Sequence, residues 1–359
     1  MMKIKIFLLL FFFSASCFAQ INLDKEFDRI TDSVLAVNPL IPGMIVSFVS
    51  SDYKWEKAKG YTDLEKKTPM RLDNTYRIGS VTKTFTISVL LQLVDEGKVS
   101  LGDNILKYFP DFPNGDKITV RMLADMRSGI YNYSESQPFE DSLTNRPAKI
   151  WNDDELVKMA LMFPSYFPPD SGFHYSNTNT ILIGRIIEKV TGSKWQSEVK
   201  KRIIDPLGLK NTWTANGRDM MGNFAHGYMQ MDSASTKLTD VTSYYDVSWA
   251  GAAGDIISDI NDIKIYLRAL GEGKFYSEKM NEARKQWAIT HGDLKYGLGM
   301  FSVGGFLGHN GGIPGFTNFS AYSPERDCSV IVMYNTQRTG ADMPDELAKR
   351  LLRAAGMLQ

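Results

Sequence analysis

The chain is predicted to fold as an α/β (α+β) protein, in which an antiparallel sheet flanked by helices holds an inserted all-helical part. Two observations support this fold class. Strand and helix patterns occupy both ends of the 359-residue chain, about 20–99 and 246–359. Residues 100–245 instead are richer in Pro, Gly, Asn and Asp and carry short helical patterns. A sheet built from both ends leaves a cleft against the insertion, where a site is expected.

The first residues form a separate unit. A short basic start precedes an unbroken apolar run over residues 6–13, and small residues follow. This pattern is typical of a signal peptide over residues 1–19, cleaved after Ala19, and its apolar run is too short to span a bilayer. We therefore expect an exported protein, periplasmic or secreted, with one domain over residues 20–359 and no transmembrane segment. A lipid anchor on Cys17 is less favoured, because no Leu stands where a lipobox usually has one.

The N-terminal part begins with an amphipathic helical pattern over residues 24–37. Strand patterns over 44–49 and 55–61 flank a polar turn, which predicts a β-hairpin. Residues 80–96 are predicted to form a mostly buried helix that Gly97 ends.

The insertion carries two clear helical patterns. The first covers residues 153–163, where Asn152 can cap the helix and Pro164 ends it. The second covers residues 180–190 and is closed by Gly192.

The C-terminal part combines helices with buried strands. A helix is expected to run from a Ser258 cap to Leu270. Residues 318–323 alternate as in a strand, and residues 329–334 form a continuous apolar strand. The last helix is expected to begin near Pro344, because proline suits the first helical position.

Charge and composition exclude several functions. Lys plus Arg and Asp plus Glu are both 41, with no basic block, so we expect neither a nucleic acid nor an anionic membrane as partner. No P-loop, H-E-x-x-H or C-x-x-C motif is present, and the four His residues show no metal-ligand spacing. We therefore expect no metal or cofactor, and we predict no particular oligomeric state. Cys328, beside an apolar run, is expected to be a buried thiol.

An S-x-x-K motif places Ser80 and Lys83 three positions apart, hence on one face of a helix. A lysine whose pKa burial lowers can take the proton of a serine hydroxyl and make it a nucleophile. Two other segments, residues 51–54 and 197–200, match the same motif. The first lies in the predicted hairpin turn and the second on a charged helix, whereas only Ser80 begins an apolar helix. The alternative for Ser80 is a helix N-cap followed by a surface lysine.

Two later motifs complete a pattern. Tyr175-Ser176-Asn177 is the only Y-x-N of the chain, and His309-Asn310-Gly311 follows a glycine-rich segment. In this order, the three motifs resemble those of the serine β-lactamase and penicillin-binding protein superfamily. The chain looks most like the branch of class C β-lactamases with their D-alanyl-D-alanine carboxypeptidase and esterase relatives. The resemblance extends over nearly the whole chain after the signal peptide and implies a β-lactamase/transpeptidase-like fold.

The resemblance also implies roles. Ser80 would attack a carbonyl and form an acyl-enzyme, and Lys83 and Tyr175 would share the proton transfers. Tyr175 would act as the base in acylation and then as the acid to the leaving group. Asn177 would bind the substrate amide or the lysine, and the backbone N–H groups of Ser80 and Gly312 would form the oxyanion hole. The structural alternatives are a buried phenol for Tyr175 and a helix N-cap for Asn177.

Further substrate contacts are implied at His309, Gly311 and Trp249. His309 stands where many relatives carry Lys and would orient the substrate or tune the tyrosine, or it is a turn residue. Residues 295–297, Lys-Tyr-Gly, are a rival match for the third motif. Trp249 lies in a segment that resembles a pocket wall of the secreted carboxypeptidases, although a core position is the alternative.

The expected substrate is a small molecule or a peptide. Carboxypeptidase relatives can hold the terminal carboxylate with a basic residue soon after the G-L-G segment, where this chain has Met300 and Phe301. The favoured hypothesis is an exported carboxypeptidase-like peptidase or an esterase, acting on D-amino-acid-containing or small acyl substrates through Ser80. The alternatives are a β-lactamase and a penicillin-binding or sensor protein that turns over slowly.

Overall fold

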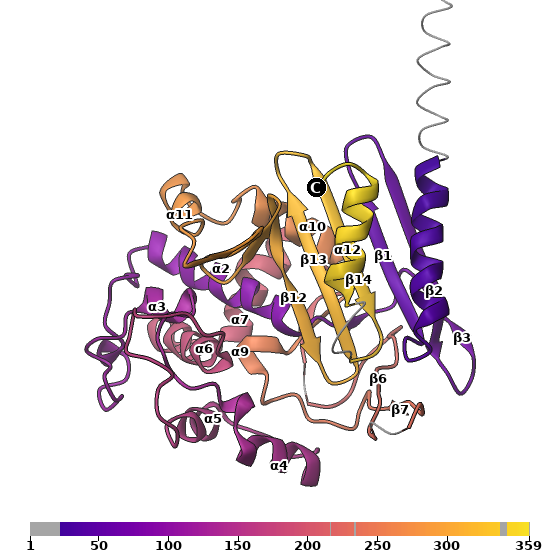
Figure 1. Ribbon diagram of the computed structural model, residues 1–359. Coiled ribbons are helices and arrows are strands. Elements are labelled where there is room, and N and C mark those ends of the chain that lie inside the picture. The colour runs from indigo at the N-terminus through magenta and orange to yellow at the C-terminus, as the bar shows by residue number, and fades with distance from the viewer. Residues whose placement is uncertain (1–21, 216, 233–234, 338–342, 359) are drawn as a thin grey trace, which may run out of the picture.

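The centre of the computed structural model is a nine-stranded sheet with the order β3-β2-β1-β14-β13-β12-β11-β10-β9 (Figure 1). The two ends of the chain meet in this sheet, where Met44 in β1 lies opposite Tyr334 in β14. All its strand pairs are antiparallel, so the predicted fold class is confirmed. The strands are β1 (Gly43–Val49), β2 (Lys54–Asp63), β3 (Thr68–Pro69), β9 (Ile289–His291), β10 (Leu294–Tyr296), β11 (Phe301–Val303), β12 (Phe306–Ile313), β13 (Phe316–Ser323) and β14 (Cys328–Tyr334).

The structure describes residues 22–215, 217–232, 235–337 and 343–358. The predicted signal peptide over residues 1–19, including Cys17, lies outside the described residues. Within the described ranges, no helix combines the length and the apolar character needed to cross a membrane.

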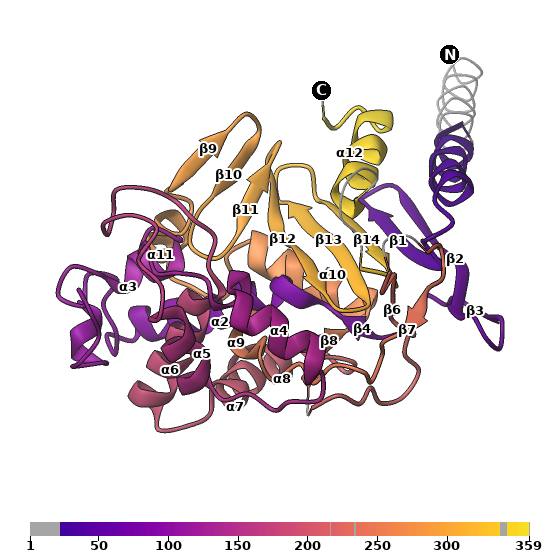
Figure 2. The same cartoon turned by 60° about the horizontal axis from the view of Figure 1, so that its bottom comes forward.

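Helices cover both faces of the sheet, which explains why every residue of β13 and β14 is buried. The helix over residues 22–37 and α12 (Pro344–Ala354) pack on one face, where Phe27 and Leu351 share a core with Val332. Helix α10 (Ile260–Gly271) packs on the other face, and Figures 1 and 2 show the sheet between these layers. The predicted start of α12 at Pro344 is confirmed.

The middle of the chain supplies the helical part. Helix α2 (Thr82–Asp95) is almost wholly buried and contacts α6 and α9, so it joins this part to the sheet. The other helical elements are η1 (Gly79–Val81), η2 (Ile105–Lys107), α3 (Val120–Ala124), η3 (Tyr133–Glu135), α4 (Gln137–Asn145), α5 (Asp153–Ala160), α6 (Asn177–Thr191), α7 (Trp195–Val199), η4 (Lys200–Ile204), α8 (Asp205–Leu207), α9 (Gly251–Gly254) and α11 (Glu278–Ala283). Two small sheets join β4 (Tyr76–Arg77), β8 (Ile256–Ser258) and β5 (Trp213–Thr214), and β6 (Tyr228–Met229) with β7 (Thr239–Asp240).

Helix ends test the sequence-based boundaries. The Asn152 cap of α5 is confirmed as part of a capping box, although the helix ends at Ala160, before the predicted residue 163. Gly192 closes α6 in the left-handed region at φ 69°. The predicted Ser258 cap of α10 is wrong: Ser258 is the last residue of β8, and the Asp259 carboxylate accepts the first free N–H groups. A carboxylate at a helix start also interacts favourably with the helix dipole.

The remaining cysteine lies where the sequence predicted it. Cys328 begins β14 and is fully buried, and burial raises the pKa of its thiol to about 12. The thiol therefore stays protonated at neutral pH.

Candidate active site

The start of α2 lies against the edge of the sheet. Gly79 adopts φ +52°, and a Cβ on it would lie 2.9 Å from the backbone nitrogen of Gly312 in β12. The Asn318 amide of β13 donates to the carbonyl of Ile78 at 3.1 Å. These contacts fix the turn that carries Ser80, whose side chain remains partly exposed.

The two other S-x-x-K matches lie elsewhere. Ser51 is exposed in the turn between β1 and β2, and Lys54 is the first residue of β2. Lys200 is exposed at the end of α7 and forms an ion pair with Asp205. Only the match at Ser80 combines the helical geometry with a buried lysine.

Lys83 is fully buried beneath Ser80. Its Nζ lies 3.1 Å from the Ser80 hydroxyl, 2.7 Å from the Oδ1 of Asn177 and 2.8 Å from the carbonyl oxygen of Ala253. Burial lowers the pKa of the amine well below its ordinary value. As an ammonium, Nζ donates to all three oxygens. Once it loses a proton, it can accept the proton of the serine hydroxyl while it still donates to the amide and carbonyl oxygens.

Tyr175 approaches Ser80 from the segment before α6. Its ring centroid lies 4.8 Å from the Nζ of Lys83. Burial raises the pKa of the phenol, an effect that the nearby Ser80 hydroxyl partly offsets. The Tyr175 hydroxyl is buried and, apart from this interaction with Ser80, forms no hydrogen bond of standard geometry among the described residues. It is therefore a neutral acid with its proton available.

His309 lies on β12 beside this tyrosine and is 2% exposed. Its Nδ1 lies 2.5 Å from the Asn310 carbonyl, which assigns the proton to Nδ1. Its Nε2 lies 3.3 Å from the Tyr296 hydroxyl, which can then donate to it. Burial, with a smaller effect of the Lys83 charge, lowers the pKa of the imidazole to about 3, so the ring is neutral. Tyr296, from the rival match for the third motif at residues 295–297, therefore belongs to the same cluster as Tyr175 and His309.

Two glycines of β12 allow the close approach of the nucleophile turn. A Cβ at Gly311 would lie 2.0 Å from the carbonyl oxygen of Ile78, so only glycine fits there. Gly312 is exposed and adjoins Gly79, the residue before Ser80. The turn that carries Ser80 therefore lies against Gly312, which is compatible with an oxyanion hole formed by their N–H groups.

Trp249 lies apart from this cluster. Its indole is 8% exposed and packs edge-on against Phe139 at a centroid distance of 5.3 Å. Its carbonyl accepts a hydrogen bond from the Tyr133 hydroxyl. The structure thus places Trp249 in the core of the helical part.

Asn177 is the first residue of α6, and Ser176 holds the N-cap position. The Nδ2 of Asn177 donates to the Ser134 hydroxyl at 2.9 Å, and its backbone N–H donates to the Oδ1 of Asn132 at 3.1 Å. These contacts orient the Oδ1 of Asn177 toward Lys83. No side-chain spacing in the sequence links residues 132–134 to Asn177, so sequence reasoning missed them.

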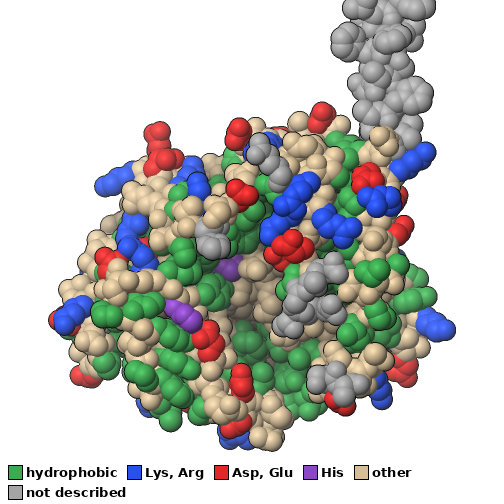
Figure 3. Space-filling view, in the orientation of Figure 1, with side chains coloured by type: hydrophobic (Ala, Val, Ile, Leu, Met, Phe, Trp, Pro, Cys, Tyr) green, Lys and Arg blue, Asp and Glu red, His purple; other side chains and the backbone are tan. Residues whose placement is uncertain are grey.

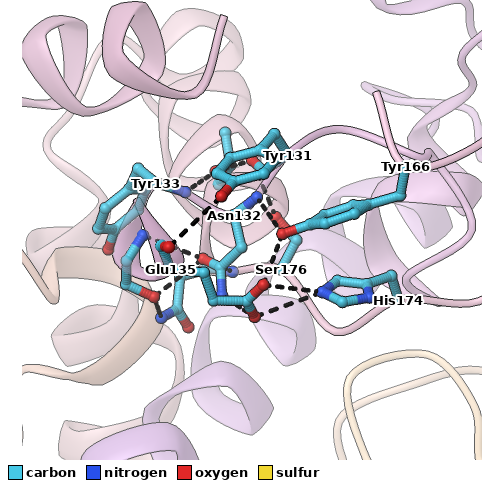
Figure 4. A network of polar contacts seen from close by, with 10 residues as sticks. Tyr131, Asn132, Tyr133, Glu135, Tyr166, His174 and Ser176 are labelled. Carbon is cyan, nitrogen blue, oxygen red and sulfur yellow. Dashed lines mark hydrogen bonds and ion pairs between the residues drawn. The ribbon is translucent and has the colours of Figure 1, made fainter. Parts of the chain in front are cut away.

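The network continues to the surface, as Figure 4 shows. The Asn132 side chain donates to Glu135 at 2.9 Å, and Glu135 also accepts from the Tyr166 hydroxyl at 2.6 Å. The Nε2 of His174 lies 3.0 Å from Glu135, and its ring stacks on Tyr166 with centroids 3.7 Å apart. The loop around η3 is therefore fastened to the segment that precedes Tyr175.

A cavity of about 530 Å³ opens beside Tyr175 and His309. Several aromatic side chains, Tyr296 and Phe301 among them, line it. In the view of Figure 3, this face of the molecule has a central hollow with hydrophobic side chains below it.

The family model described as Beta-lactamase matches residues 29–355. Beta-lactamase-like protein 2 of Dictyostelium discoideum is 29% identical over 76% of this chain, which spans about half (51%) of that protein's length. A D-stereospecific amidohydrolase from a Streptomyces species matches with a TM-score of 0.82 and 28% identity, covering 92% of this chain and 98% of its own. The D-amino acid amidase of Ochrobactrum anthropi, solved with L-phenylalanine amide, matches with a TM-score of 0.81 and 27% identity, covering 93% and 99%.

Proposed function

Since the chain belongs to the β-lactamase family of serine hydrolases, we propose that it cleaves amides or esters of D-amino acids or of small acyl groups through an acyl-enzyme on Ser80. The observation that carries the proposal is the buried amine of Lys83, 3.1 Å from the Ser80 hydroxyl and beside a phenol that forms no hydrogen bond of standard geometry among the described residues. The similarity to two hydrolases named for D-amino acids or D-stereospecificity supports the substrate class. A D-alanyl-D-alanine carboxypeptidase-like peptidase and an esterase both fall within it.

In acylation, the neutral amine of Lys83 takes the proton of Ser80 while the Ser80 oxygen bonds to the substrate carbonyl carbon. The backbone N–H groups of Ser80 and Gly312 stabilise the negative carbonyl oxygen. The bond to the leaving nitrogen or oxygen then breaks, and Tyr175 donates its proton to that atom. The Lys83 ammonium returns its proton to the phenolate, which restores both groups.

This assignment reverses the role that the family resemblance implied for Tyr175 in the first step. Burial lowers the pKa of Lys83 and raises that of Tyr175. The lowered pKa means that Lys83 loses its proton more readily than an ordinary lysine, and the raised pKa means that Tyr175 keeps its proton at neutral pH, so Lys83 is assigned as the base and Tyr175 as the proton donor.

The test combines two reagents and one mass measurement. The purified protein is incubated with a p-nitrophenyl ester and with matched D- and L-amino acid amides, and its intact mass is followed over time. We expect a transient acyl adduct, product release and a preference for the D-amides. Ser80→Ala should abolish both adduct and turnover, whereas Ser51→Ala and Ser197→Ala, the serines of the other two motif matches, should behave like the parent. Equal turnover by Ser80→Ala would contradict the proposal.

A fluorescent penicillin separates the two alternative functions. Rapid return of the penicillin-treated protein to its free mass identifies a β-lactamase. A persistent adduct without ester or amide turnover identifies a penicillin-binding or sensor protein.

Export also belongs to the proposal, because the N-terminal pattern is typical of a signal peptide. N-terminal sequencing of the protein from the periplasm or the medium should begin at Gln20. Recovery of the uncleaved chain from the cytoplasm would contradict export.

A further inference from the structure

The cavity beside Tyr175 adjoins the residue that acts on the leaving group in the proposed reaction. Tyr175 forms part of its wall and, in the proposed reaction, gives its proton to the leaving atom. The oxyanion position at Gly312 lies three residues beyond His309 along β12, about 10 Å away at roughly 3.3 Å per residue. The cavity therefore lies on the Tyr175 side of the oxyanion position, where the bond to the leaving group would break.

The wall of this cavity beside Tyr175 is aromatic. Phe301 is 5% exposed and stacks on Phe319 with centroids 5.3 Å apart, and Phe173 packs edge-on against Tyr296 at 5.6 Å. The volume of about 530 Å³ falls in the usual range of small-molecule sites and exceeds what a phenyl ring needs.

The charges around the cavity do not favour an anion. Two acids and two bases line it: Asp293, Asp345, Lys349 and Arg353. Lys349 already lies 2.6 Å from a carboxylate oxygen of Glu346 and 3.8 Å from Asp345. His309 is neutral, and Phe301 cannot pair with a carboxylate. Both bases belong to α12, so a carboxylate held at the aromatic wall beside Tyr175 would lose its hydration and gain no cation from the residues of that wall.

From these contacts we infer that the cavity is a leaving-group pocket that selects apolar groups, with Phe301 as its main specificity residue. The inference rests on the proposed acyl-transfer function and narrows its substrate class. The preferred substrates are amides or esters whose leaving amine or alcohol carries an alkyl or aryl chain. Peptides whose leaving amino acid carries a free carboxylate next to the scissile bond are poor substrates.

The test uses one D-amino acyl group with two leaving groups of equal length, n-pentylamine and 5-aminopentanoate, which differ in a terminal methyl or carboxylate. The ratio of the two kcat/KM values is measured on one enzyme sample, so it does not depend on the fraction of active protein. We expect the pentylamide to be favoured at least tenfold, since a single methylene in an apolar pocket changes kcat/KM by roughly 10–200-fold. The common acyl group keeps deacylation the same for both substrates.

Three variants sharpen the result. Phe301→Leu should reduce the ratio and Phe301→Lys should bring it below one, because the new ammonium can pair with the carboxylate. Phe112→Ala, a truncation of a buried aromatic far from the site in sequence and outside the cavity wall, should leave the ratio unchanged even where it lowers stability.

The outcomes separate the two levels of the proposal. If Ser80-dependent turnover occurs and the parent ratio is near or below one, the pocket inference is overturned while the proposed function stands. An unchanged ratio in both Phe301 variants overturns it as well. If neither amide is cleaved and no acyl adduct forms, the proposed function itself fails.

Discussion

The two sides of Ser80 differ in how their polar atoms are satisfied. On the helical side, the Lys83 amine has partners on three segments: Ser80, the Asn177 side chain and the Ala253 carbonyl. On the sheet side, the Tyr175 hydroxyl forms no hydrogen bond of standard geometry among the described residues, and His309 is surrounded by aromatic rings. The helical side is therefore fixed before substrate arrives, whereas the sheet side offers a proton and apolar walls that a substrate would complete.

The largest effect is expected from removing the Lys83 amine on the helical side. Lys83→Met should lower kcat/KM toward the upper end of the roughly 10²–10⁴-fold range of acid–base catalysis, because Ser80 loses its base. The melting temperature should change little, because removing a buried ionisable group is offset by the loss of its hydrogen bonds to the Asn177 and Ala253 oxygens. Steady-state kinetics and thermal unfolding measure both.

Lys200→Met is the matched control, because it removes the lysine of another S-x-x-K match that is exposed. It should keep the parent kcat/KM. Wild-type acylation rates in Lys83→Met would remove Lys83 from the mechanism.

On the sheet side, Tyr175→Phe should cost about 10²-fold in kcat/KM for amides. The loss should be much smaller for a p-nitrophenyl ester, whose leaving group departs without a proton. The measurement is the ratio of the amide and ester effects in the same variant. An equal loss for both substrates would mean that Tyr175 does not act as the acid to the leaving group.

The sequence predicts the two sides unequally well. Ser80 and Lys83 follow from helical spacing, because residues three apart share a face. The other partners of Lys83 are 94 and 170 positions away, and one is a backbone carbonyl with no side-chain signature. Tyr175 and His309 were indicated only by the order of family motifs.

The fold shows the same limit. The long strands β1 and β14 carry clear periodic patterns, and both were predicted. Strands β9, β10 and β11 have three residues each, too few for a period, and none was predicted as a strand. These strands form part of the wall of the leaving-group pocket. The sequence alone could therefore show that Phe301 stands where carboxypeptidase relatives can carry a basic residue, but it could not show which side chains surround Phe301.

The hydrogen bonds that hold Asn177 test how much the helical side depends on the residues behind it. Asn132→Ala removes the acceptor of the Asn177 N–H and of the Ser134 hydroxyl. We expect kcat to fall about tenfold and KM to change little. Displacement of Asn177 disturbs the alignment of the reacting groups more than it weakens substrate binding. Asn145→Ala, on the exposed end of α4, is the control and should match the parent. A change in KM alone would assign Asn132 to substrate binding instead.

A further prediction concerns stability on the sheet side and follows from His309. Its folded pKa is lowered to about 3, whereas an unfolded histidine titrates near 6.5. Between these values the unfolded chain binds the extra proton, so the free energy of unfolding falls as pH drops below about 6.5, by at most about 1.4 kcal/mol per pH unit. Chemical denaturation from pH 7 to 4 measures this slope, and His309→Gln should flatten it. Equal slopes in the parent and His309→Gln would show that the imidazole is not buried in its neutral form.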